Sequence, residues 1–342
     1  MSSRPAKSPS SIGGVTLRLG GALLALALAV LIGGSVGATR LSPHDLIAAL
    51  EHPNAGTDAS TILWALRLPR AILAAIVGAA LGTAGAMLQG MLRNPLVDPY
   101  LTGVSAGAAA AIAIAVASGV AAPFVPALGF AAGLCSAIIV ASLARRGSGL
   151  DANRLILAGV SLSALFSAIV ALVLTRLQQG GYAETIISWL AGSLAGRTWH
   201  DLTWTLPYLA IGAAASVLAV PALNVLRLGD VRAAALGVNV ARAQWTIVGS
   251  ASLLTASAVA LSGIVGFVGL IVPHIGRRIG GSDMRVALPL SALCGAGFMT
   301  LADAVSRSLF APVEIPLSVL LACIGVPAFL YLYFRDTGIS RA

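Results

Sequence analysis

Long apolar runs recur along the whole chain, and they constrain its fold more than any other feature. Each run holds about 20 residues, and a helix of that length crosses roughly 30 Å of hydrocarbon. The runs are continuous rather than alternating, so they predict transmembrane helices and not the strands of a membrane β-barrel. Only 10% of the 342 residues are charged, against about 25% in ordinary globular domains. We therefore expect an all-α integral membrane protein.

About ten transmembrane helices are expected, over residues 19–38, 70–92, 101–119, 124–143, 154–174, 202–223, 243–262, 270–279, 286–309 and 317–334. The eighth run is too short to cross alone, and half-helices at membrane depth must be covered by protein or line a cavity. The stretch SGIVGFVGLIVPHIGRR therefore predicts a turn into the bilayer and a buried half-helix. The expected organisation is a tail over 1–18, a transmembrane domain over 19–335 and a tail over 336–342.

Basic residues predict the orientation, because cytoplasmic loops are enriched in lysine and arginine. With the N-terminus inside, 15 of the 21 basic residues are cytoplasmic: Arg4, Lys7, Arg18, Arg93, Arg145, Arg146, Arg154, Arg227, Arg232, Arg242, Arg277, Arg278, Arg285, Arg335 and Arg341. Six remain outside: Arg40, Arg67, Arg70, Arg176, Arg197 and Arg307. Both termini are thus expected in the cytoplasm. The sequence has no basic domain with interleaved aromatic residues, so no nucleic-acid partner is predicted.

The stretch MLRNPLVDPYLTG interrupts the apolar pattern on the predicted cytoplasmic side. Pro95 and Pro99 each remove a backbone donor and disfavour helical conformation in the residue before them. A helix cannot continue here, so Asn94 and Leu96 are candidates for a movable constriction. The alternative is a plain cytoplasmic turn.

A polar insert over 226–244 separates the sixth and seventh runs. It predicts two short helices, the first ending at Leu236 with Gly237 as its stop and the second beginning at Asn239. Such a pair would form a rigid lever on the cytoplasmic face. The alternative is a surface loop.

Three arginines at the predicted outer ends run against the topological bias. Guanidinium groups bind carboxylates in a bidentate manner, so Arg67, Arg70 and Arg307 are candidates for docking an acidic partner. The alternative is anchoring to lipid phosphates. Asp303, the one acid well inside an apolar run, is expected to pair with Arg307 four residues later.

Two sequence motifs, one absent and one present, bear on a possible enzymatic activity. No G-x-x-x-x-G-K-[ST] phosphate-binding loop is present, so any ATP hydrolysis would need another chain. The stretch GVSAG over 103–107 matches the nucleophile-elbow pattern, so an intramembrane serine hydrolase using Ser105 and His274 is a rival hypothesis. Small residues with serine are also typical of helix packing in membranes. The other histidines lack metal-ligand spacing, and no metal site is predicted.

The chain resembles the permease subunits of ABC importers for iron chelates and vitamin B12, the FecCD-type family. The segments with this resemblance are RLPRAILAAIVGAALGTAGAMLQGMLRNPLVDPYLTGVSAGA, LILAGVSLSALFSA, WLAGSLAGRTW, RLGDVRAAALGVNV, GIVGFVGLIVPHIGRR and LADAVSRSLFAPVEIPLSVLLACIGVPAFLYL. The resemblance implies a type II ABC importer permease fold, a homodimer, two ATPase subunits and a substrate-binding protein, in a bacterial cytoplasmic membrane. It implies no cofactor in this chain, because the partner ATPase binds ATP and magnesium.

Residue roles also follow from the resemblance. It implies that Arg67, Arg70 and Arg307 meet glutamates of the binding protein, and that Asn94 and Leu96 form a cytoplasmic gate. The coupling helices that seat in the ATPase would include Leu228, Gly229, Asp230, Ala235, Leu236, Gly237, Val238 and Asn239. A second constriction in relatives uses small hydroxyl residues, whereas this chain has Asp151 and Ala152 there. The expected cargo is a ferric siderophore, with heme and cobalamin as alternatives, and Arg176 is a possible contact for an anionic cargo.

Overall fold

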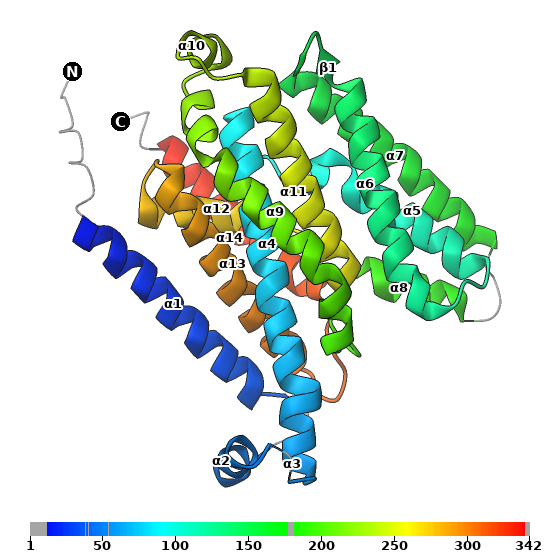
Figure 1. Cartoon of the computed structure of the whole chain (residues 1–342). Coiled ribbons are helices and arrows are strands. Elements are labelled where there is room, and N and C mark those ends of the chain that lie inside the picture. Colours follow the sequence, from blue (N-terminus) through cyan, green and yellow to red (C-terminus); the bar gives the residue numbers. More distant parts are fainter. Residues whose placement is uncertain (1–11, 38, 40, 54, 177–180, 339–342) are drawn as a thin grey trace.

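The computed structural model describes residues 12–37, 39, 41–53, 55–176 and 181–338. Arg4, Lys7, Arg40 and Arg341, together with the outer parts of both predicted tails, lie outside the described residues. Apart from a two-stranded hairpin of β1 (Arg145–Arg146) and β2 (Gly149–Leu150), the regular structure of the described part is helical. The helices form one bundle (Figure 1).

The main helices are α1 (Ile12–Ser35), α2 (Pro43–Glu51), α3 (Asp58–Thr61), α4 (Leu68–Leu92), α5 (Val104–Ala117), α6 (Val125–Leu143), α7 (Ala152–Arg176), α8 (Tyr182–Leu190), α9 (Trp199–Leu226), α10 (Asp230–Ala235), α11 (Val240–Ser262), α12 (Val268–Gly280), α13 (Met284–Ser306) and α14 (Leu317–Gly338). A π-helical turn, η1 (Ile62–Arg67), joins α3 to α4, and two 3-10 turns are η2 (Pro99–Thr102) and η3 (Ala122–Phe124). Seven helical segments are long and apolar enough to cross a membrane. Together with α14 and the shorter α5 and α12 they account for the expected segments, so the predicted all-α membrane fold is confirmed.

Two features differ from the sequence-based expectation. The second membrane segment is longer, because α3, η1 and α4 form one helical run over Asp58–Leu92. The short helices α2 and α8 were not predicted, since each has only nine residues and a polar face. A capping box fixes the start of α2, with the Ser42 hydroxyl accepting from the Asp45 N–H while the Asp45 carboxylate accepts from the Ser42 N–H.

The expected half-helix is confirmed. α11 ends at Ser262, the chain turns over 263–267, and α12 then runs for 13 residues with much of its surface buried. The turn uses a left-handed backbone conformation at Phe267, whose φ is 68°. This irregular backbone is partly buried, and Ile264, Gly266 and Phe267 line a cavity, which is a setting in which non-helical backbone is tolerated at membrane depth.

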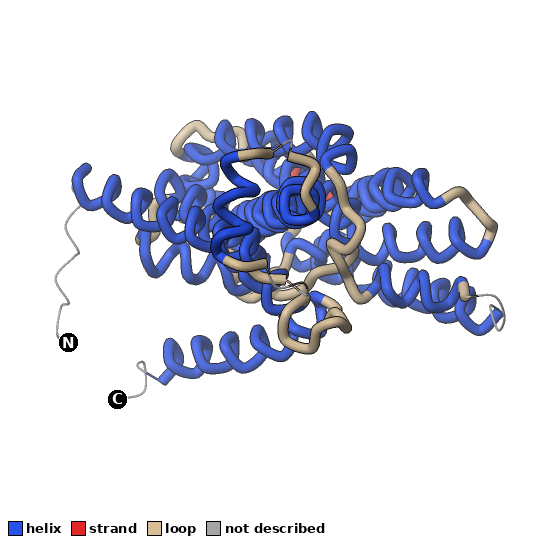
Figure 2. Tube along the Cα trace, turned by 90° about the horizontal axis from the view of Figure 1, so that it is seen from below, coloured by secondary structure: helices blue, strands red, loops and turns tan. Residues whose placement is uncertain are grey.

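Each end of the bundle gathers particular elements. α10 and the hairpin of β1 and β2 lie at one end, with the end of α14 directed toward it, and α2 and α3 lie at the other end (Figure 1). The trace seen from the α3 end is almost entirely helical (Figure 2). This arrangement agrees with the predicted grouping of the arginine-rich loops, while the side of the membrane that each end faces stays a prediction.

Glycines let α4 contact its neighbours through the backbone. A Cβ atom on Gly78 would lie 2.0 Å from the carbonyl oxygen of Gly295 on α13, and a Cβ on Gly295 would lie 2.2 Å from that of Gly78. On the same helix, a Cβ on Gly85 would lie 2.0 Å from the carbonyl oxygen of Gly269 on α12. Small residues at helix interfaces are what close packing in lipid requires. α4 is consequently the buried central helix of the bundle.

A matched pair of substitutions on α13 tests this packing. Gly295→Ala is expected to destabilise the protein by about 1–3 kcal/mol, because the added methyl group forces α4 and α13 apart. Gly297→Ala is the control, since the nearest heavy atom to its added Cβ is the Cα of Leu26 at 4.0 Å. Thermal unfolding in detergent should show a lower Tm for Gly295→Ala only. Equal Tm values would contradict the backbone contact.

Candidate functional site

The predicted break between α4 and α5 is confirmed. α4 ends at Leu92, and Arg93 adopts the left-handed conformation with φ of 53°. The Asn94 side chain accepts a hydrogen bond from the Leu96 N–H at 2.9 Å, and the Asp98 carboxylate accepts one from the Tyr100 N–H at 2.9 Å. These side chains take over backbone donors that a continuous helix would satisfy. The role of Asn94 and Leu96 as a gate stays a prediction.

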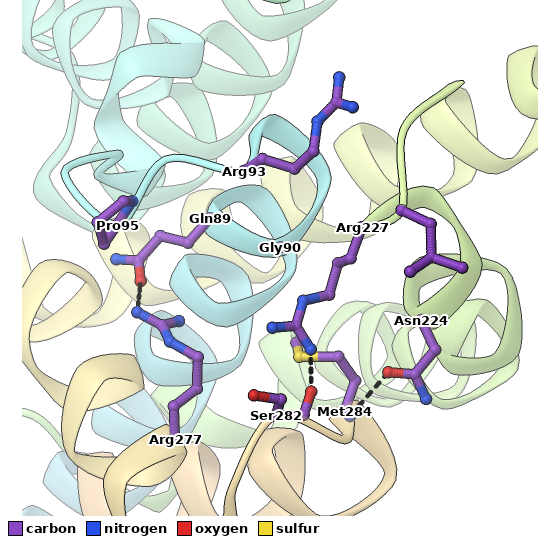
Figure 3. Close-up of a pocket in the computed structure, with 10 residues that line it drawn as sticks. Gln89, Gly90, Arg93, Pro95, Asn224, Arg227, Arg277, Ser282 and Met284 are labelled. Carbon is purple, nitrogen blue, oxygen red and sulfur yellow. Dashed lines mark hydrogen bonds between the residues drawn. The ribbon is translucent and has the colours of Figure 1, made fainter. Parts of the chain in front are cut away.

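Gln89, in the last turn of α4, holds this break in place. It is buried, and its Nε2 donates to the carbonyl oxygen of Val97 at 3.0 Å and to that of Gly269 at 3.1 Å. Its Oε1 accepts a hydrogen bond from Arg277 at 2.7 Å (Figure 3). One side chain therefore joins the end of α4, the non-helical segment and both ends of α12.

A pocket of about 420 Å³ opens beside Gln89 and is rich in arginine (Figure 3). Arg93, Arg227 and Arg277 line it together with Asn224 and Ser282. Arg227 donates to the backbone oxygen of Ser282, and within the described residues neither Arg227 nor Arg277 has a carboxylate within 4.0 Å. The mouth of the break at this end is therefore positively charged.

On its other side the break borders a cavity of about 650 Å³. Its lining residues are mainly apolar or hydroxyl-bearing: Asp98, Tyr100, Leu101, Ser105, Ala106, Ala109, Val160, Ser163, Ser167, Val170, Leu190, Ile264, Gly266, Phe267 and Leu270. Asp98 is the single charged residue in that lining, and no arginine or lysine belongs to it. The Tyr100 hydroxyl donates to the Val265 carbonyl at 2.9 Å and accepts from the Val265 N–H at 2.9 Å, which fixes the wall between the break and α12.

The residues proposed for the rival hydrolase lie in a different setting from a nucleophile elbow. Ser105 is the second residue of α5 and follows the 3-10 turn η2, whereas an elbow places the serine between a strand and a helix. The described part of the chain has no strand other than β1 and β2. Ser105 lines the cavity, and His274 lies on α12. Arg176 is the exposed last residue of α7 and is not among the lining residues of the cavity.

At the opposite end, Arg70 and Arg307 share a buried carboxylate. The Nε of Arg70 donates to Asp303 at 2.9 Å, and the Nε of Arg307 donates to the same carboxylate at 3.1 Å. The expected pair of Asp303 and Arg307 is thus confirmed. Both Nη atoms of Arg70 donate to Glu314, at 2.8 and 2.9 Å. Glu314 was missed because it lies 244 residues from Arg70 in the sequence.

Arg67 has a different environment from the other two arginines. Its guanidinium donates to the backbone oxygens of Gly34, Ser35 and Thr39, and within the described residues it has no carboxylate partner. It lines a pocket of about 320 Å³ that Arg70, Arg197, Arg307 and Glu314 also line. Asp303 and Glu314 balance the charges of Arg70 and Arg307, and Asp201 lies 3.3 Å from Arg197. The positive charge of Arg67 is therefore the one in excess. Docking by Arg67, Arg70 and Arg307 stays a prediction.

The polar insert over 226–244 forms one short helix rather than the two expected. α10 covers Asp230–Ala235, between Gly229 with φ of 108° and Gly237 with φ of 82°. Asn239 caps α11 itself, because its side chain accepts a hydrogen bond from the Arg242 N–H at 2.9 Å. The second expected helix is therefore the first turn of the following membrane segment.

Apolar side chains around α10 are exposed at this end of the bundle. Leu228 is 54%, Val231 85% and Leu236 64% exposed. Exposed apolar residues on an otherwise polar insert indicate a surface that a partner covers. The sequence did not predict that Val231 belongs to this surface, because a single apolar residue between Asp230 and Arg232 gives no such signal.

Replacing the shared carboxylate tests the cluster around Asp303, which is fully buried. Asp303→Asn keeps the side-chain size but leaves Arg70 and Arg307 without that charge, and breaking a buried pair in this way costs about 3–5 kcal/mol. Glu314→Gln is the control, because the Glu314 side chain is 37% exposed and water can replace its contacts. Unfolding in detergent should show a much larger loss of Tm for Asp303→Asn. Equal losses would contradict the assignment of Asp303 as the shared anchor.

Comparison with known proteins places the chain in a family. Residues 24–335 match the model of the FecCD transport family. The chain is 41% identical over 207 residues to a cobalamin import system permease of Halobacterium salinarum, covering 60% of this chain and 55% of that protein. It is 38% identical over 211 residues to a hemin transport system permease of Yersinia pestis, covering 60% and 61%. It is 37% identical over 208 residues to an Fe(3+)-citrate import system permease of Bacillus subtilis, covering 61% and 62%.

The matched stretches thus span less than two thirds of these relatives. A solved structure extends the comparison, since it covers 93% of this chain and 98% of its own, with 33% identity and a TM-score of 0.84. It is described as an ABC transporter of the metal-chelate type in an inward-facing conformation. The chain therefore belongs to the FecCD transport family, as a permease subunit of the ABC importer class.

Proposed function

We propose that two copies of this chain form the membrane part of a binding-protein-dependent importer that moves an iron(III) chelate into the cytoplasm. The observation that supports it is the exposed apolar surface of Leu228, Val231 and Leu236, at the end of the bundle that also holds the break after α4. That surface suits an ATPase subunit, and the sequence itself has no phosphate-binding loop. The chain is thus a transport subunit in a multi-pass membrane complex, and ATP and magnesium are bound by the partner.

The mechanism is alternating access. ATP draws two ATPase subunits together, α10 moves with the subunit on which it is seated, and the non-helical segment with Asn94 and Leu96 shifts relative to α12. Because the segment is already non-helical, this motion breaks no helix. The cavity beside it is lined mainly by small and apolar side chains, which favours weak contact and fast release. Affinity would then come from the substrate-binding protein.

The cavity lining also favours one class of cargo. Since Asp98 is its single charged residue, the lining favours positively charged chelates over anionic ones and does not repel neutral chelates. Ferric hydroxamates of neutral or positive charge fit this requirement better than heme with its propionates or a citrate complex. Cobalamin stays an alternative, and the relatives have mixed cargoes. Arg176 lies outside this lining, so the cavity gives no support for its contact with an anionic cargo.

Uptake by cells that lack the gene tests the function and the cargo together. Labelled ferric hydroxamate, hemin and cobalamin are supplied separately, with and without the gene restored. We expect hydroxamate uptake to be lost with the gene and to return with it. Loss of hemin uptake alone would contradict the cargo class but not the importer function. Unchanged uptake of all three compounds, in a strain with no second importer, would contradict both.

Charge reversal at the outer end tests docking of the binding protein. Arg67→Glu places a like charge opposite an acidic partner, and we expect the affinity for the binding protein to fall about tenfold or more. Arg176→Glu is the control, because Arg176 is exposed and lies outside the pocket of Arg67. Binding is measured on purified protein of unchanged Tm, with Arg67→Gln as a milder variant. Unchanged affinity in both Arg67 variants would remove the docking assignment.

A further inference from the structure

We infer that Gln244 is a positioning residue. Together with Asp230, it links α10 to two breaks in the helical structure at this end of the bundle. One break follows α4 and contains Asn94, and the other is the hairpin between α6 and α7. The inference rests on the proposed function, because it assigns how the movement of a seated ATPase would reach the transport path. It depends on three polar contacts that meet at the start of α10.

The first contact joins α10 to the break after α4. Asp230 is the first residue of α10, and its Oδ1 lies 3.4 Å from the Nη2 of Arg93. Arg93 is the left-handed residue that ends α4 and directly precedes Asn94. The approach is close at the backbone as well, since a Cβ on Gly229 would lie 3.1 Å from the Nη1 of Arg93. A displacement of Asp230 therefore shifts Arg93, the residue at which the non-helical segment begins.

The second and third contacts join α10 to the hairpin between α6 and α7. The Nε2 of Gln244, on α11, donates to the Oδ2 of Asp230 at 3.2 Å. The Oε1 of the same side chain accepts a hydrogen bond from the Leu150 N–H at 2.8 Å. Leu150 ends β2 and directly precedes Asp151, whose carboxylate accepts from the Arg154 N–H at 3.0 Å at the start of α7. α7 forms part of the cavity wall through Val160 and Ser163.

Burial distinguishes Gln244 from the rest of the network. Gln244 is 5% exposed, so its amide has few water molecules to replace a lost partner. The side chains of Asp230 and Arg93 are 44% and 46% exposed, and an ion pair that accessible contributes little to stability. α10 itself buries only Ala233 against the bundle. The polar contacts of Asp230 are thus a large part of what links α10 to the two breaks, and they set geometry more than stability.

The second of these breaks adjoins Asp151 and Ala152, which stand where the family resemblance implies small hydroxyl residues. The structure offers that segment a different role. The Leu150 N–H of this hairpin donates a hydrogen bond to Gln244, so the hairpin can move with α10 without a hydroxyl side chain of its own. The network therefore needs an amide at position 244, where one group can donate to Asp230 and accept from Leu150 at the same time.

The test uses the full transporter, with its ATPase and binding protein, in proteoliposomes. Gln244→Leu removes both hydrogen bonds at similar side-chain volume, and we expect the amount of chelate transported per ATP hydrolysed to fall about tenfold. Arg242→Gln is the control, because Arg242 is an exposed neighbour on α11 whose side chain is outside the network. A purely structural role would lower the Tm without changing this ratio. Combination with Arg93→Gln should give less than the product of the two single effects.

If Gln244→Leu does not fold, Asp230→Asn provides the second variant, since it removes the ionic contact with Arg93 on the exposed side of the network. We expect it also to lower the ratio, together with faster amide hydrogen exchange at Leu150 and over 94–98. A normal ratio in both folded variants would overturn the inference and leave the importer intact. Absence of ATP-dependent uptake by the unaltered chain would overturn the proposed function, and the inference with it.

Discussion

The structure depends on how closely α4 approaches α12 and α13. Gly78 and Gly295 meet backbone to backbone, and Gly85 meets Gly269 in the same way, so no side chain separates the helices at these two points. In lipid there is no hydrophobic driving force between helices, and such contacts gain their stability from packing. They place α4 in the centre of the bundle. Its two ends then position the two regions that hold the candidate functional residues.

The arginines near the two ends of α4 differ in whether they have carboxylate partners within the chain. At one end Arg70 has both of its carboxylate partners inside the chain, Asp303 and Glu314, which is how an ionisable cluster is tolerated near a membrane. At the other end Arg227 and Arg277 have no such partner within the described residues, and they face an open pocket. The cavity beyond the break has a single acid and no base. Charge is thus sparse in the cavity, whereas arginines gather at the mouth of the break.

Local rules explain most of what could be predicted from the sequence. Apolar length predicted the membrane helices, and the two X-Pro pairs predicted the end of α4, because each rule acts within a few residues. The glycine-rich turn before α12 was predicted for the same reason. Asn239 was misassigned because a cap signal does not say whether a short helix or a full membrane segment follows it. α2 and α8 have only nine residues each, which is too short to give a membrane-spanning apolar run.

Contacts between distant residues could not be predicted. Glu314 reaches Arg70, and Gln244 reaches Leu150, only because the bundle folds them together. Nothing in the local sequence names the partner in either case. A usable signal did exist, since Gln89 and Gln244 are amides within or beside apolar runs and such polar residues need partners at membrane depth. These two amides therefore mark both junctions in the sequence, without indicating their partners.

The central claim is that the segment after α4 is a constriction that moves when an ATPase acts on α10. The most direct measurement is the distance between spin labels at position 96 in the two subunits of the assembled transporter, with the native cysteines replaced. Leu96 is 45% exposed and accepts a label without displacing the core. The account predicts that the distance changes when ATP is bound and returns after hydrolysis. An unchanged distance, in a transporter that still moves its cargo, would contradict it.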